Sequence, residues 1–245
     1  MVTLFLLTIA ATTIVALVVR KRREAIYQKQ RSSITTLRMQ NARNTMSPHF
    51  FFNVLASFYG MAYQPEQLKV KVKSLSKLLR TVIENIDCIA IPAGQELETV
   101  KAYIDLYKGK IPDPFMVEYL IEEGANLERL IPAMVIQIPV ENAIKHGLMP
   151  LNGEKKLILR IAESEDCQTI EIEDNGIGLK ASEGHSTGTG TGLKVLLQTI
   201  HLLNAGNSRK IKFELNDRGD ADAQTSGTIV RIEIPFDFNY KLMRI

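Results

Sequence analysis

The amino-acid sequence predicts an α+β protein of several parts: a transmembrane helix, a helical hairpin and a mixed α/β domain. Three observations predict this order. The first 19 residues carry no charge, residues 20–90 repeat apolar side chains at helical spacing, and five strand-like runs follow residue 114. The chain has 245 residues, of which 45% are hydrophobic and 23% charged, so it is long enough for one or two folding units with buried cores. Wholesale disorder is therefore excluded.

The net charge of +3 is unevenly distributed. Between Arg20 and Arg43 there are eight Lys and Arg residues against the single Glu24, whereas the chain from Met46 onward has 22 basic and 26 acidic residues. The basic excess thus lies beside the apolar N-terminus, which argues against direct nucleic-acid binding by the folded body. The two cysteines are too few for a disulfide scaffold or a thiolate zinc cluster.

Residues 1–19 form the predicted transmembrane helix. As a helix they span roughly 28 Å, close to the hydrocarbon thickness of a bilayer. A signal peptide or a buried core helix are the alternatives, but a signal peptide has its basic residues before the apolar run. Here Arg20–Arg23 follow the apolar run, so we expect this end of the helix on the cytoplasmic side of a bacterial inner membrane. Only Met1 would lie outside, so we expect either that there is no extracellular sensing domain or that the chain is the end of a longer protein.

Residues 20–90 form the predicted linker helix and dimerisation hairpin. Residues 20–62 read as one helix with a weak, partly polar heptad, and a second helix starts near Pro65. Two amphipathic helices cannot bury both apolar stripes alone, so we expect a homodimer with a four-helix bundle. The stripe of the second helix is the clearer one, and its members are Leu68, Val72, Leu75, Leu79, Val82 and Ile86.

Residues 91–245 form the predicted α/β sandwich. A helix near Glu96–Lys108 comes first, and the Ile-Pro-Asp-Pro run at 111–114 ends it. Further helices are expected at 133–147 and 193–204. The predicted strands lie between these helices, at Phe115–Ile121, Lys156–Ile161, Thr169–Glu173, Lys210–Leu215 and Thr228–Ile234.

The first cluster with chemical potential is Glu141-Asn142-Ala-Ile-Lys145-His146, on a predicted helix. Glu141 and Lys145 are four residues apart and share a face, as do Asn142 and His146. Taken alone, the first pair is a solvated ion pair. A carboxylate beside an uncharged amide also suits an octahedral Mg²⁺ that carries bound phosphates.

Two glycine-containing clusters follow. Asp174, Gly176 and Gly178 come directly after a strand and could form a plain hairpin turn, but a buried aspartate can also accept a hydrogen bond from an exocyclic amine. Gly188, Gly190, Gly192 and Leu193 open a helix, whose N-terminal N–H groups suit phosphates. Neither cluster is specific alone.

The order and spacing of the three clusters are more specific. They resemble the N, G1 and G2 boxes of the Bergerat ATP-binding fold, which serves gyrases, heat-shock chaperones, mismatch-repair ATPases and histidine kinases. This resemblance implies ATP and Mg²⁺ as cofactors, Asn142 at the Mg²⁺ site and Asp174 as the adenine reader. It also implies a phosphate loop from Gly188 to Gly192, a lid over residues 179–187, and a Thr228 that supports adenine recognition.

The stretch Ser47–Asn53 contains a histidine on the predicted dimer helix. On the heptad, His49 lies beside the seam and is accessible, and Asn53 shares its face and could orient the imidazole. An accessible imidazole is a nucleophile near neutral pH. A lone surface histidine is the ordinary alternative.

With Pro48–Asn53 and Pro139–Gly147 together, the chain from Leu37 to Phe236 resembles LytS/YehU-type sensor histidine kinases. The resemblance implies autophosphorylation of His49 from ATP and transfer to an aspartate of a response-regulator receiver domain, often one with a LytTR-type output domain. Glu141, Lys145 and His146 lie in the matching N box, the last two beside the nucleotide phosphates. Two other classes remain open: an ATP-hydrolysing machine without a phosphoprotein, and a scaffold without catalysis.

Overall fold

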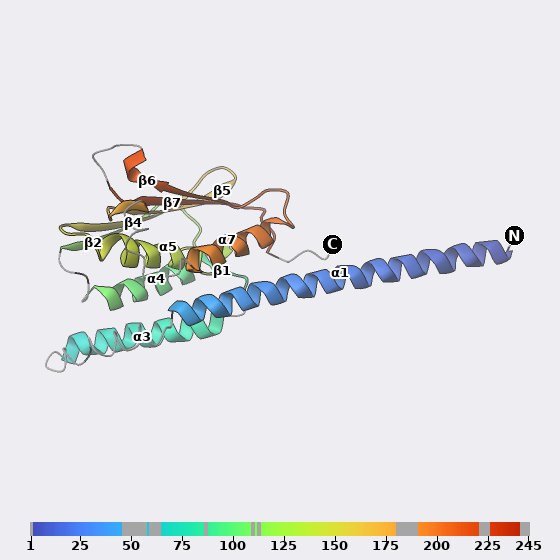
Figure 1. Cartoon of the computed structure of the whole chain (residues 1–245), viewed down its shortest axis with the longest axis horizontal. Helices are drawn as coiled ribbons and strands as arrows, with labels where there is room; N and C mark the ends of the chain where they lie inside the picture. Colours follow the sequence, from blue (N-terminus) through green and yellow to red (C-terminus); the bar gives the residue numbers. More distant parts are fainter. Residues whose placement is uncertain are drawn as a thin grey trace.

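The computed structural model describes residues 2–45, 58, 65–85, 88–108, 111, 114–179, 191–220 and 226–240 (Figure 1). Its helices are α1 (Val2–Thr45), α3 (Pro65–Asn85), α4 (Ala93–Tyr107), α5 (Gln137–Asn142), the π-helix η1 (Ala143–Leu148), α7 (Thr191–Asn204) and the 3₁₀-helix η2 (Arg218–Asp220). Its strands are β1 (Ala90–Pro92), β2 (Phe115–Ile121), β3 (Leu130–Pro132), β4 (Lys155–Glu163), β5 (Cys167–Asp174), β6 (Lys212–Asp217) and β7 (Thr228–Pro235).

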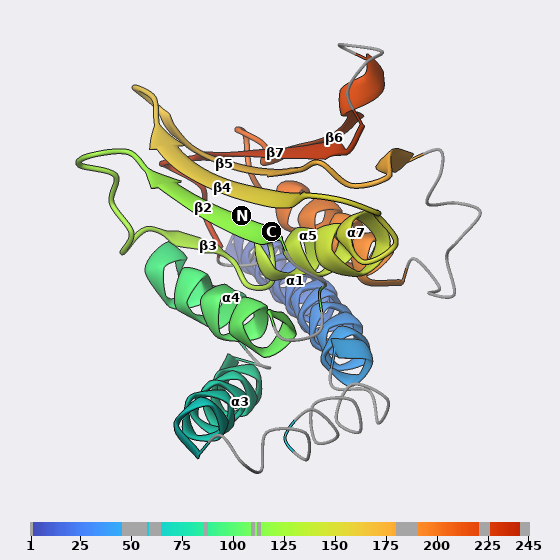
Figure 2. The same ribbon diagram turned by 90° about the vertical axis from the view of Figure 1, so that its left-hand side faces the viewer.

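The body of the molecule is a five-stranded sheet with helices on one face. The strand order is β2-β4-β5-β7-β6, with β2 and β4 parallel and the other neighbours antiparallel. Helices α4, α5 and α7 lie on the same side of this sheet (Figure 2). The expected α/β sandwich is confirmed, and all five expected strands form with boundaries moved by at most three residues.

The alternation of the strands sends one set of side chains to the helices. In β5, Gln168, Ile170, Ile172 and Asp174 are buried, and the residues between them are partly exposed. The opposite face of the sheet carries ion pairs instead, such as that of Arg160 with Glu171 and Glu173, both at 2.7 Å. The period of two therefore fixes Asp174 as an inward-facing carboxylate.

The segment expected as one helix over 133–147 is built in three pieces. Ala133–Ile136 form a turn in which Met134 has φ of 71°, α5 begins at Gln137, and residues 143–148 form a π-helix. Pro139 lies in the first turn of α5, where a missing N–H costs little, so it does not break the helix. The small strands β1 and β3, which pair with each other, were not predicted, because three residues are too few to show a period.

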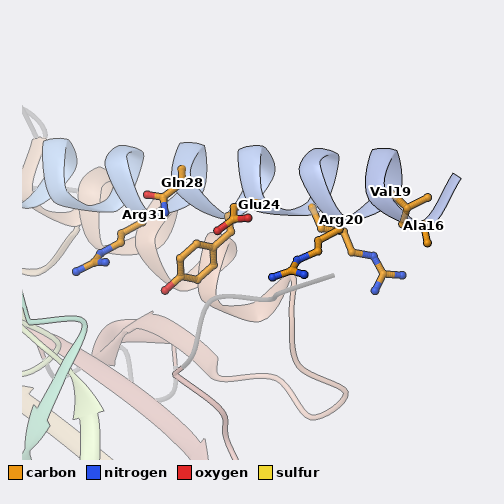
Figure 3. A pocket seen from close by; sticks show the side chains of 8 residues that line it. Ala16, Val19, Arg20, Glu24, Gln28 and Arg31 are labelled. Atoms are coloured by element: carbon orange, nitrogen blue, oxygen red, sulfur yellow. The ribbon is translucent and has the colours of Figure 1, made fainter. Parts of the chain in front are cut away.

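Helix α1 is 44 residues long, about 66 Å at the rise of an α-helix. It contains a candidate membrane span by length and composition, Thr3–Thr36, whose apolar window has a mean hydropathy of 2.1 and is not buried in the chain. The basic stretch follows on the same continuous helix, where one side of α1 lines a hollow of about 660 Å³. Figure 3 shows Arg20 and Arg31 projecting on that side.

Both long helices contact the body. α1 packs beside α7, and its Ile34 is 1% exposed in the main apolar cluster. α3 packs on α4 through a face that includes Lys71 and Leu78, whereas Val72 of the expected stripe is 44% exposed. Leu75 of that stripe lies partly buried against the cluster. The expected continuation of the first helix from 46 to 62 lies outside the described residues except for Phe58.

Candidate functional site

Asp174 is the last residue of the central strand β5 and stands opposite Thr228, the first residue of β7. Its side chain is 1% exposed. One carboxylate oxygen, Oδ1, accepts the N–H of Gly176 at 2.8 Å, and the other, Oδ2, accepts the hydroxyl of Thr228. The sheet register therefore brings together two of the predicted adenine-contacting residues.

The ionisation of Asp174 is set by opposing effects. Burial raises the pKa of its carboxyl group, while the hydrogen bonds from Thr228 and Gly176 and the charge of Arg218 lower it. The net shift is upward, because desolvation is the largest of these effects. The carboxylate is thus a buried acceptor whose charge is only partly compensated.

Glycines make the contact between this strand end and the π-helix. A β-carbon on Gly176 would lie 2.5 Å from the Cα of Gly147 and 2.6 Å from Oδ1 of Asp174. The N–H of Ile177 donates to the carbonyl of Gly147 at 3.2 Å. Gly147 at the end of the first cluster therefore lies directly against the second cluster, and only glycine allows that approach.

Asp217, the last residue of β6, lies at the same end of the sheet as Asp174. It stands opposite Thr228 across the β6–β7 pair, as Asp174 does across the β5–β7 pair. Its Oδ2 accepts the N–H of Leu179 at 2.9 Å, and a β-carbon on Gly178, where φ is 80°, would lie 3.0 Å from that oxygen. Asp217 thus holds the chain where it leaves the Asp174 turn.

The other cluster occupies α5 and the π-helix. The ammonium of Lys145 bonds Oε1 of Glu141, and their side chains are 29% and 14% exposed. The predicted ion pair is thus present and lies half-buried. Asn142 is the last residue of α5 and is partly exposed. Burial, and then the charge of Lys145, lower the pKa of His146, although Glu141 raises it.

The remaining predicted residues are only partly visible. Gly192 and Leu193 lie in the first turn of α7, as expected for a loop that opens a helix. Gly188, Gly190, His49 and Asn53 lie outside the described residues. Their assigned roles stay predictions, as do those of the residues that the structure does place.

The described residues fit a nucleotide with a magnesium ion. The buried carboxylate of Asp174 is an acceptor that suits an exocyclic amine, and the glycines beside it pack their bare backbone against Gly147 and Asp217. Among the described residues there is no group of three or more His, Cys, Asp or Glu residues that could hold a metal. Glu141 and Asn142 would therefore have to share a Mg²⁺ with phosphate oxygens and water, which is how proteins usually bind this ion.

Sequence reasoning missed the residues that support the site. Asp217 and Arg218 follow the strand that was expected to end at Leu215, and an Asp before a turn is too common to single out. Glu96 was assigned only to a helix, although it lies 1% exposed under α5. A charged residue at a buried position of an amphipathic helix is the signal that could have found it.

Comparison with known proteins identifies two regions. Residues 37–115 match the family described as histidine kinase. Residues 129–237 match the family described as histidine kinase-, DNA gyrase B- and HSP90-like ATPase. This second match covers Asp174 and Thr228 as well as α5, the π-helix and α7.

Individual relatives agree with these matches. The chain is 27% identical over 78% of its length to the sensor protein LytS of Staphylococcus epidermidis, and 32% identical over 65% to the sensor histidine kinase YpdA of Escherichia coli. It spans only 32% and 28% of the lengths of these two proteins. A histidine kinase domain from Erythrobacter litoralis EL346 superposes with a TM-score of 0.45 at 13% identity, over 89% of this chain and 97% of that one.

Proposed function

We propose that the chain is a membrane-anchored, ATP-dependent histidine kinase of a two-component system, because residues 37–115 and 129–237 match histidine kinase and ATPase families and the chain is similar to LytS sensor proteins. The observation that carries this proposal is the buried carboxylate of Asp174, which accepts hydrogen bonds from Gly176 and Thr228 at the end of β5 and lies beside Gly147. It joins a buried acceptor, a hydroxyl and glycine backbone, and it lies next to the helix that carries Glu141 and Asn142.

In the proposed reaction, ATP supplies the γ-phosphoryl group and Mg²⁺ offsets its charge. Asp174 accepts a hydrogen bond from the exocyclic amine of adenine, and Thr228 fixes the carboxylate. Glu141 and Asn142 hold the metal side, and the N–H groups around Gly188, Gly190 and Gly192 neutralise phosphate oxygens. A nitrogen of His49 bonds to the γ-phosphorus as the bond to the bridging oxygen breaks, and ADP leaves. The phosphoryl group then passes to an aspartate of a receiver domain.

The homodimer is part of this proposal. α3 uses one face against α4 and leaves apolar side chains exposed beside it: Val70, Val72 and Ile83 are 59%, 44% and 64% exposed. Exposed apolar side chains along one helix favour a partner helix. A second copy of the chain would supply one in the four-helix bundle, with His49 on its flank.

The membrane anchor also belongs to the proposal. Within the candidate span of α1, the apolar residues 3–19 are followed without a break by Arg20–Arg23, so the positive-inside rule favours an ATPase body on the cytoplasmic side. The bacterial inner membrane is the location that follows. Transfer to a regulator with a LytTR-type output domain is the partner that the resemblance suggests.

The test is phosphorylation of the purified chain in detergent with γ-labelled ATP. We expect acid-labile labelling of the wild type and loss of labelling in His49→Ala, with ATP affinity unchanged. His201→Ala is the matched control, because His201 is exposed on α7, and it should label as the wild type does.

Three outcomes would contradict the proposal. Continued labelling of His49→Ala would show that a residue other than His49 is phosphorylated. Steady phosphate release without labelled protein would indicate an ATP-hydrolysing machine, and ATP binding with neither activity would indicate a scaffold.

A further inference from the structure

Glu96 is a carboxylate buried within the ATPase body, on α4, with 1% of its surface exposed. A buried carboxylate costs free energy unless hydrogen bonds or an opposite charge compensate it. Its Oε1 accepts the N–H groups of Ile136 at 2.6 Å and Gln137 at 3.1 Å, and its Oε2 accepts that of Met134 at 3.1 Å. All three donors precede or open α5.

The backbone of the turn is shaped to receive that carboxylate. Met134 adopts φ of 71°, a left-handed conformation that non-glycine residues rarely take. A left-handed residue next to right-handed ones turns successive N–H groups toward one point and forms an anion-binding concavity. The first turn of α5 has no side-chain cap of its own, so Glu96 supplies from α4 the negative charge that a helix N-terminus favours.

α4 also holds the second helix of the hairpin. On its other side, Glu98 pairs with Lys77 of α3 at 2.7 Å, and Gln95 donates to Asn85 of α3 at 3.2 Å. α4 thus lies between α3 and the helix that carries Glu141 and Asn142. The residues of α4 that contact α3, and Glu96, which accepts hydrogen bonds from the start of α5, all lie within residues 95–98.

The packing at this junction leaves little room for adjustment. Asn85, Glu96 and Gln137 line a cavity of only about 10 Å³, the size of one water molecule. The Nε2 of Gln137 is buried there and has no hydrogen-bond partner among the described residues. α4 and the residues that open α5 are therefore closely packed at this junction.

We propose that Glu96 is a positioning residue for the metal end of the nucleotide site. Its carboxylate fixes the N-terminus of α5, so that Glu141 and Asn142, one turn further on, are held at the phosphates. It also passes displacement of α3 to them through α4. This inference rests on the proposed function and adds to it a link between the dimerisation hairpin and the metal ligands.

The test compares Glu96→Gln with Glu98→Gln in the full chain. Glutamine keeps the shape but brings an NH₂ group against backbone donors, whereas Glu98 is half-exposed and bonds only Lys77 and Lys101 among the described residues. Calorimetry measures the affinity for ADP in EDTA and for ATP with Mg²⁺. We expect Glu96→Gln to weaken MgATP binding about tenfold while metal-free ADP binding stays within twofold. Glu98→Gln should change neither affinity.

The outcomes separate the inference from simpler explanations. An equal loss of both affinities would mean that Glu96 only stabilises the fold, and unchanged MgATP binding would also overturn the inference. If the wild type itself binds no ATP, the proposed function fails instead.

Glu96→Asp guards against a variant that does not fold. It keeps the charge but shortens the side chain by one methylene, so we expect a smaller loss that is still confined to MgATP. If Glu96→Gln is insoluble, a Glu96→Asp protein with wild-type MgATP affinity would overturn the inference.

Discussion

At the adenine end of the proposed site, Asp174 is 1% exposed and is held by a hydroxyl and backbone N–H groups, whereas at the metal end Glu141 of the largely buried α5 pairs with Lys145 of the π-helix. The first arrangement is fixed by the register of β5 and β7, because both residues stand at paired strand positions. The second lies on α5, and where this helix begins the carboxylate of Glu96, from another helix, accepts the N–H groups of Ile136 and Gln137.

The comparison shows two ways of placing polar groups. A sheet places them through its own hydrogen bonds, here between residues 54 positions apart in the chain, so the strand register sets their geometry. A short helix with a π-turn needs support from outside, because α5 has only six residues before the π-helix and cannot hold itself. We therefore expect the adenine end to be rigid and the metal end to respond to the rest of the molecule.

The largest expected effect is that of Gly176→Ala, which disrupts the contact of Gly176 with Gly147 between the adenine end and the metal end of the proposed site. The new β-carbon would lie 2.5 Å from the backbone of Gly147, so one element must move. We expect a loss of about 1–3 kcal/mol in the free energy of unfolding and no measurable ATP binding, by urea titration and calorimetry. Gly153→Ala is the control, because its β-carbon would meet nothing within 4 Å while its φ of 106° strains an alanine and also costs stability; ATP binding as weak as in Gly176→Ala would contradict the explanation.

Asp174→Asn breaks the adenine end alone. The amide presents an NH₂ group where adenine needs an acceptor, so ATP affinity should fall on the order of tenfold or more. The free energy of unfolding should change by no more than about 1 kcal/mol, because the lost hydrogen bonds offset the relief of burying a charge. Calorimetry and urea titration measure the two quantities.

The control for this variant is Asp166→Asn, at the far end of β5. Asp166 is 60% exposed and pairs with Arg209, so neither quantity should change. An Asp174→Asn protein with unchanged ATP affinity would remove this residue from the adenine role.

The smallest expected effect is a difference in pH dependence between the two ends. The pKa of His146 is lowered, mainly by burial, so the folded state binds its proton less tightly than the unfolded chain does. Its contribution to stability is therefore present above about pH 6.5 and declines as the pH falls below that value. The pKa of Asp174 is raised, mainly by burial, so its protonation on acidification stabilises the fold while it weakens nucleotide binding.

Urea titrations from pH 7.5 to 5 measure this difference. His146→Gln should lose less stability on acidification than the wild type, and Asp174→Asn should lose more. A His146→Gln protein that follows the wild type at every pH would show that burial of this imidazole does not affect folding.

Much of the adenine end could be predicted from the sequence. The alternation in β5 makes Asp174 inward-facing, and Asp-x-Gly-x-Gly after a strand marks the turn that follows it. The two strands that pair there, 167–174 and 228–235, were both expected, although the sequence alone did not show that they are neighbours. Local patterns were sufficient because a period of two and a glycine turn are local properties.

The metal end was harder to predict. The motif at 141–146 was recognised, but the helix was expected to run from 133 to 147 in one piece. Neither the left-handed Met134 nor the π-helix has a sequence pattern of its own. The N–H of Met134 donates to Glu96, which comes from a helix 38 residues earlier in the chain.

The sequence by itself thus determined the order of the parts: an apolar segment with a basic flank, amphipathic helices, and strands between helices with three polar clusters. Short-range periodicity and turn chemistry encode all of these. Only the tertiary structure decided that Gly147 touches Gly176, that Asp217 and Asp174 flank Thr228, and that Glu96 caps α5. These contacts join residues far apart in the chain, and they form only when the sheet register and the packing of α4 bring their backbones together.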